Sequence, residues 1–136
     1  TDGLTDAEVH SQPLGLTSVA QHLRHIARST DRILTYAEGG QLGGDQLALL
    51  KAESAGAEGS NKETLAALLA EVEASFANAA ARVRNLAGAD LNIPRHVGRK
   101  QLPTSIGGAL IHVADHTQRH VGQVVTTAKM LKAMRS

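Results

Sequence analysis

Five of the seven histidines in this 136-residue sequence fall into two groups whose spacing could build a metal site. His112, His116 and His120 lie four residues apart in the segment IHVADHTQRHVGQ, and His22 and His25 lie three apart in QHLRHIARSTDR. Residues three or four apart share one face of a helix, so each group would present its imidazoles along one stripe. If two such helices pack side by side, three neutral histidines and a solvent molecule can form the open coordination shell of a catalytic metal.

Two familiar kinds of metal site are excluded by the residues around these histidines. HVADH has the histidine spacing of a zinc-protease helix, but Val113 stands where that motif requires a glutamate base. A di-iron carboxylate site needs paired Glu-x-x-His repeats, which neither histidine group contains. Because the sequence has no cysteine, thiolate ligands, a cysteine nucleophile and disulfides are excluded as well.

The two histidine groups lie in the first and last of three long segments in which apolar residues recur at helical spacing. The first helix is predicted from about Thr17 to Glu38 and the second from about Asn61 to Ala87. The third follows Pro103 and Thr104 and continues to about Met134.

Capping residues and apolar stripes support these helices. Ser18 with Gln21, and Ser60 with Glu63, predict capping boxes at the starts of the first two helices. The apolar stripes are predicted to face the core, and they include Phe76 and Val83 in the second helix and Val121 in the third.

Three shorter segments connect or support the long helices. Short helices are expected at Thr5 to His10 and at Asp45 to Glu53, whereas strand signals are essentially missing. The segment from Gly88 to Pro103 is rich in turn formers and is expected to cross an end of the bundle. Three long helices are one fewer than a four-helix bundle needs, so the short segments or a second subunit must cover the remaining side of the core.

The composition limits the classes of partner. The net charge of +1 comes from 14 basic and 13 acidic residues spread along the chain. This distribution predicts no basic surface that would bind a nucleic-acid backbone. No apolar run approaches the roughly 18 to 20 residues that cross a bilayer, and no charged-then-apolar leader opens the sequence. We therefore predict one cytoplasmic domain over residues 1–136, with neither nucleic acid nor membrane as a partner.

Two segments carry a resemblance to a known family. HLRHIARSTDRILTYAEG, followed far downstream by HVADHTQRHVGQVVTTAK, resembles the two signature helices of the DinB/YfiT-like superfamily of metalloenzymes. The likeness covers about Thr17 to Lys132, and its specific parts are His-Ile-Ala-x-Ser-Thr and His-x-x-x-His-x-Gly-Gln. It implies an all-α four-helix bundle with up-down-down-up topology, often dimeric. The family's usual long first helix has no clear counterpart in Thr1 to Leu16, so this helix is expected to be short or truncated.

Matched position by position, the resemblance assigns the metal ligands to His25, His116 and His120. The helical wheel by itself places His22 nearer the core than His25, so the two lines of reasoning differ. We follow the resemblance, because a ligand should lie on the helix edge that faces its partner. The residues that could serve as alternative ligands, or orient a ligand imidazole, are His22, His112, Asp115 and Gln123. Arg32 and Tyr36 could bind an anionic substrate.

The resemblance implies a metal-dependent enzyme that acts on a small molecule, either a transferase using a low-molecular-weight thiol or a hydrolase. One divalent ion is expected, zinc or nickel first, with iron or manganese as alternatives; no catalytic residue is assigned. The alternative is a non-catalytic bundle with a structural or sensing metal site. Such a site would be closed by a fourth protein ligand, for which His22 and His112 are candidates, whereas an enzyme keeps one position open.

Overall fold

Three long helices dominate the structure, a computed structural model that describes residues 1–55 and 62–135. The elements in chain order are α1 (Asp6–Val9), the 3₁₀ turn η1 (Pro13–Gly15), α2 (Val19–Ala37), α3 (Gly44–Ser54), α4 (Leu65–Asn85), β1 (Pro94–Val97), β2 (Leu102–Ser105) and α5 (Ile106–Ala133). The predicted all-α fold is confirmed. Within the described residues, no helix is both long and apolar enough to cross a membrane.

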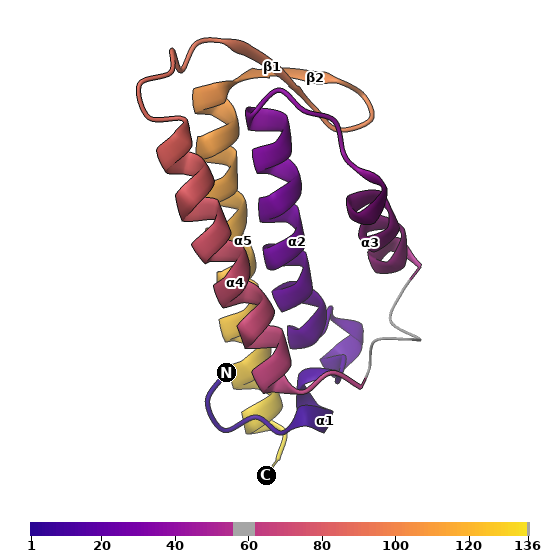
Figure 1. The fold of residues 1–136 in the computed structure, drawn as a ribbon. Coiled ribbons are helices and arrows are strands. Elements are labelled where there is room, and N and C mark those ends of the chain that lie inside the picture. The colour runs from indigo at the N-terminus through magenta and orange to yellow at the C-terminus, as the bar shows by residue number, and fades with distance from the viewer. Residues whose placement is uncertain (56–61, 136) are drawn as a thin grey trace.

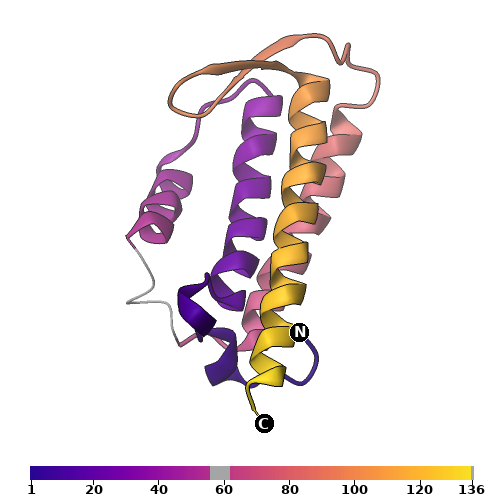
Figure 2. The same ribbon diagram turned by 180° about the vertical axis from the view of Figure 1, so that it is seen from behind.

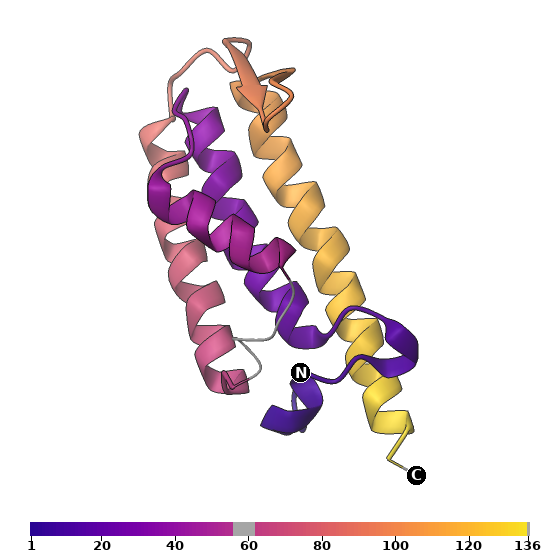
Figure 3. The same cartoon turned by 90° about the vertical axis from the view of Figure 1, so that its right-hand side faces the viewer.

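The long helices form a bundle, and both ends of the chain lie at the lower end of it in Figure 1. α2 and α4 run in one direction and α5 runs in the other, as in the last three helices of an up-down-down-up bundle (Figure 1). Seen from behind, α5 lies nearest the viewer beside α2, with α4 behind it (Figure 2). α2 packs against both of the other long helices. α3 flanks α2 outside this group of three helices (Figures 1 and 3).

α2 begins with the capping box that the sequence predicts. Ser18 Oγ accepts a hydrogen bond from the Gln21 N–H at 3.1 Å, and Gln21 Oε1 accepts one from the Ser18 N–H at 3.0 Å. Gly39, with φ +84°, adopts the left-handed conformation just past the end of the helix. These two ends fix where the helix carrying His22 and His25 starts and stops.

α4 begins at Leu65, four residues later than predicted. Thr64 Oγ1 caps the helix by accepting from the Ala67 N–H at 3.1 Å, and the predicted cap Ser60 lies outside the described residues. Glu63 precedes the helix and forms an ion pair with an arginine of α2. The predicted start is wrong because that carboxylate is engaged across the fold, and Thr64 supplies the cap instead.

The connection between α4 and α5 contains an antiparallel hairpin of β1 and β2, which lies over one end of the bundle (Figure 1). The expectation of no strands is therefore wrong. Each strand has only four residues, too few for a clear alternating pattern in the sequence. The hairpin is tied to the helices by tertiary contacts, since Arg95 Nε donates to the Ala37 carbonyl at the end of α2 at 2.8 Å.

The apolar core lies where α2 contacts α4 and α5. Its most completely buried large side chains include Val19, Ile26, Leu34, Leu68 and Ile106. The α4–α5 face is less well covered, because Phe76, Val83 and Val121 are 37%, 42% and 46% exposed. The prediction that these three face inward is wrong, since no helix in the described part of the chain packs over them.

Candidate metal centre

α2 and α5 bring together His25, His116 and His120, which we call the histidine triad. One ring nitrogen from each lies within 4.8 Å of those of the other two. His25 Nε2 and His116 Nε2 are 3.1 Å apart, and the His120 ring centroid lies 4.6 Å from that of His25 and 4.5 Å from that of His116. The structure thus places in one cluster the three histidines that the family resemblance selects.

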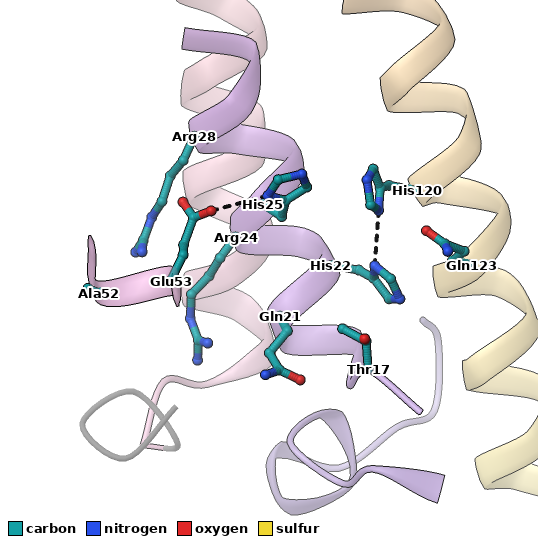
Figure 4. A pocket seen from close by; sticks show the side chains of 10 residues that line it. All are labelled: Thr17, Gln21, His22, Arg24, His25, Arg28, Ala52, Glu53, His120 and Gln123. Carbon is teal, nitrogen blue, oxygen red and sulfur yellow. Dashed lines mark hydrogen bonds and ion pairs between the residues drawn. The ribbon is translucent and has the colours of Figure 1, made fainter. Parts of the chain in front are cut away.

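Two rings of the triad donate from Nδ1 to oxygen acceptors. Glu53 Oε2 lies 3.1 Å from His25 Nδ1 (Figure 4), and an ionised carboxylate can only accept, so this ring carries its proton on Nδ1. Ser29 Oγ lies 3.3 Å from His116 Nδ1 and donates its own proton to the His25 carbonyl. It therefore accepts from His116, and both rings present an unprotonated Nε2 to the centre.

His22 holds the third ring. Its Nδ1 lies 3.1 Å from His120 Nδ1 (Figure 4). Gln123 also hydrogen-bonds to His120. His22 and Gln123, predicted as alternative ligands or orienting residues, thus lie against a triad ring and outside the cluster of three.

The triad fits a divalent metal ion. With Zn–N bonds of about 2.0–2.1 Å, tetrahedral geometry separates ligand nitrogens by about 3.3 Å, close to the spacing of His25 Nε2 and His116 Nε2. Imidazole nitrogen is a ligand that zinc, nickel and iron all accept. Each ring also has a hydrogen-bond partner at Nδ1, and metal-binding histidines generally have such a partner at the nitrogen that does not bind the metal.

Burial favours the neutral forms of His116 and His120. It lowers the pKa of His116 and of His120 to about 4, and the neighbouring histidines and Arg119 add to the effect by charge repulsion. Burial also lowers the pKa of His22. Because only neutral imidazole coordinates a metal, no proton has to be displaced from His116 or His120 near pH 7.

Glu53 is a functional candidate that sequence reasoning missed. Burial opposes its ionisation, but hydrogen bonds from His25 and Arg32 outweigh this effect and lower the pKa of the carboxyl below 4.5. Arg32 Nη1 and Nη2 lie 3.0 and 3.3 Å from its two oxygens. Glu53 lies 28 residues beyond His25 on another helix, so no spacing rule links the two. Arg32, predicted to bind an anionic substrate, is engaged with Glu53.

The sequence profile of the DinB superfamily matches residues 1–124. The chain belongs to the DinB superfamily. All three histidines of the triad lie within the matched residues. No curated protein and no solved structure matches this DinB-superfamily chain significantly.

Two cavities of this DinB-superfamily protein adjoin the triad and share His25. The first, of about 380 Å³, is bordered by polar and charged side chains such as Gln21 and Arg28 (Figure 4). The second, of about 400 Å³, lies toward the hairpin and includes Tyr36 and Arg99 together with leucines of α3. The triad therefore lies between two spaces, each large enough for a small molecule.

The remaining predicted residues lie at different distances from the triad. The His112 ring centroid is 5.7 Å from that of His116, and both residues line the second cavity. Tyr36 lines the same cavity and is buried. Asp115 is exposed on α5, and no hydrogen bond or ion pair among the described residues joins it to the triad.

Proposed function

We propose that this protein is a metal-dependent enzyme in which His25, His116 and His120 hold one divalent ion. The observation that supports the proposal most strongly is the convergence of three imidazoles, each with a hydrogen-bond partner at Nδ1. Zinc or nickel is expected first, with iron or manganese as alternatives. The bound ion would supply a Lewis acid that lowers the pKa of a thiol or water.

The chain's own residues support an open site. No fourth His, Asp or Glu in the described part of the chain joins the triad, so a small molecule can complete the coordination. This favours an enzyme over the alternative, a closed structural or sensing site. The substrate we propose is a small molecule, and the two cavities that meet at His25 favour a reaction with two reactants. Transfer involving a low-molecular-weight thiol has two such reactants, whereas hydrolysis, the second candidate, needs one cavity for its organic reactant.

The metal content of tag-free protein tests this proposal. Elemental analysis should find about one divalent ion per chain, and His116→Ala should reduce this content to a small fraction. His96→Ala is the matched control, because His96 is an exposed histidine of the hairpin. Wild-type protein that stays metal-free after incubation with zinc and with nickel would contradict the proposal.

A homodimer is also proposed, and the α4–α5 face supports it. An open apolar groove of about 660 Å³ runs along this face. Five exposed residues of α5 recur beside it at alternating steps of three and four, the spacing of a coiled-coil seam. This α5 seam consists of Ile111, Ala114, Gln118, Val121 and Val125.

The α5 seam is complementary to itself. Ile111 and Val125 each lie seven residues from Gln118. If two copies pair antiparallel about Gln118, each Ile111 therefore meets the other copy's Val125, and the two Gln118 amides can hydrogen-bond to each other. A surface that pairs with itself in this way is what a twofold dimer requires.

A cytoplasmic location remains a prediction from the sequence.

A further inference from the structure

α3 is attached to α2 mainly through polar contacts. No residue of α3 is buried. Near its start, Gln46 Nε2 donates to Asp31 Oδ2 at 2.7 Å and to Thr35 Oγ1 at 2.8 Å. Near its end, Glu53 accepts hydrogen bonds from Arg32 and His25. The position of α3 therefore depends on two polar attachments, and one of them is a histidine of the triad.

Glu53 and the centre of the triad lie at opposite ends of the same imidazole. His25 Nδ1 contacts Glu53 Oε2 at 3.1 Å, while His25 Nε2 lies 3.1 Å from His116 Nε2. The Glu53 side chain is 14% exposed, so little water competes for its oxygens. Arg32 contacts both oxygens and holds the carboxylate in place. In this orientation of the His25 ring, Nδ1 donates to Glu53 and Nε2 faces the centre of the triad.

We propose that Glu53 is a positioning residue for the metal centre, and that metal binding strengthens the attachment of α3 to α2. This inference rests on the proposed function only in requiring that the triad binds a metal. A cation on His25 Nε2 withdraws electron density from the ring and makes the Nδ1–H a stronger donor to the carboxylate. Because coupling is reciprocal, whatever the Glu53 contact adds to metal affinity, the metal adds to the docking of α3.

The coupling matters for the cavities because α3 forms a wall of both. Ala52 and Glu53 border the first cavity, and Leu47 and Leu50 border the second. A bound metal would therefore also fix the walls of the spaces in which a small molecule meets it. Protein without metal would have less well-defined cavities.

Zinc affinity of Glu53 variants tests the positioning role. With zinc sulfate and a chromogenic chelator as competitor, Glu53→Ala should bind zinc about 10- to 100-fold more weakly than wild type. Glu53→Gln should lose less, because its amide oxygen still accepts from His25 Nδ1. The matched control is Glu71→Gln, which removes another carboxylate paired with an arginine of α2, Arg28 at 2.9 Å, and should leave zinc affinity unchanged. Far-UV circular dichroism confirms that each variant is folded.

Hydrogen exchange tests the coupling to α3. Zinc should slow amide exchange over residues 44–54 in wild type and in Glu71→Gln, and should slow it much less in Glu53→Ala at saturating zinc. The positioning role is overturned if Glu53→Ala binds zinc as tightly as wild type. The coupling is overturned if zinc leaves the exchange of α3 unchanged in wild type. Failure of wild type to bind zinc, nickel, iron or manganese would instead overturn the metal site itself.

Discussion

Each histidine of the triad has a separate neighbour at Nδ1, and these neighbours come from different positions in the chain. Glu53 comes from α3, whereas Ser29 and His22 come from α2, one turn on either side of His25. The oxygen acceptors of Glu53 and Ser29 select the tautomers of His25 and His116 before any ligand arrives. A site built in this way would need little rearrangement to bind the proposed metal ion.

Substitution of the two α2 histidines distinguishes a ligand from the residue that orients one. His25→Ala should abolish stoichiometric zinc binding, because it removes one of three nitrogens. His22→Ala should keep one zinc per chain but bind it about 10-fold more weakly, because only the contact with His120 Nδ1 is lost. Isothermal titration calorimetry measures both quantities. A normal stoichiometry in His25→Ala together with loss of zinc in His22→Ala would reverse the assignment.

The lowered pKa values predict how the stability of the metal-free protein depends on pH. His116 and His120 have folded-state pKa values of about 4, below the unfolded value of about 6.5. Between these values the unfolded chain binds more protons, so the free energy of unfolding should fall as the pH decreases from 7 to 5. Urea denaturation with chelator present measures the slope. A variant with His116→Asn and His120→Asn should show a shallower slope, and an unchanged slope would contradict the prediction.

At the scale of the elements, the sequence predicts those features that depend on residues within a single helix, namely its apolar stripe and its cap. The apolar spacing gives α2 and α5, and the Ser18 box gives the start of α2 correctly. The start of α4 and the β1–β2 hairpin depend on partners elsewhere in the fold, so local patterns miss them. The site follows the same division. Histidine spacing on α2 and α5 predicts two groups that can converge, and the family resemblance selects His25 over His22. Glu53 joins the triad only through the packing of α3 against α2.

The corrected start of α4 can be tested at its cap. Thr64→Ala should lower the free energy of unfolding by about 1 kcal/mol, because the Ala67 N–H loses its acceptor. Thr64→Ser keeps a hydroxyl in place and should recover most of the loss. Chemical denaturation of the two variants and wild type measures the difference. Equal stability of Thr64→Ala and wild type would show that the helix is capped elsewhere.

At the scale of the whole molecule, the contacts among the three long helices build both the triad and the apolar core. The packing of α2 against α5 builds the triad, and the packing of α2 against both α4 and α5 builds the core. The opposite side of α4 and α5 contributes to neither and leaves Thr117 Oγ1 buried without a hydrogen-bond partner among the described residues. Contact with another protein surface would remove the apolar side chains of this groove from water. The proposed dimer would cover a face that the isolated chain leaves open.

Val121→Glu tests this dimer. Wild type should elute at twice the 14.2 kDa chain mass in size-exclusion chromatography with light scattering. In the variant a carboxylate enters the apolar interface, twice in a twofold dimer, and its desolvation should shift the protein to the monomer. Met134→Glu is the matched control, because Met134 is 60% exposed beyond the end of α5 and away from the groove. Wild type that is monomeric at every concentration tested would rule out the dimer. Zinc binding should survive in monomeric Val121→Glu, because all three triad histidines belong to one chain.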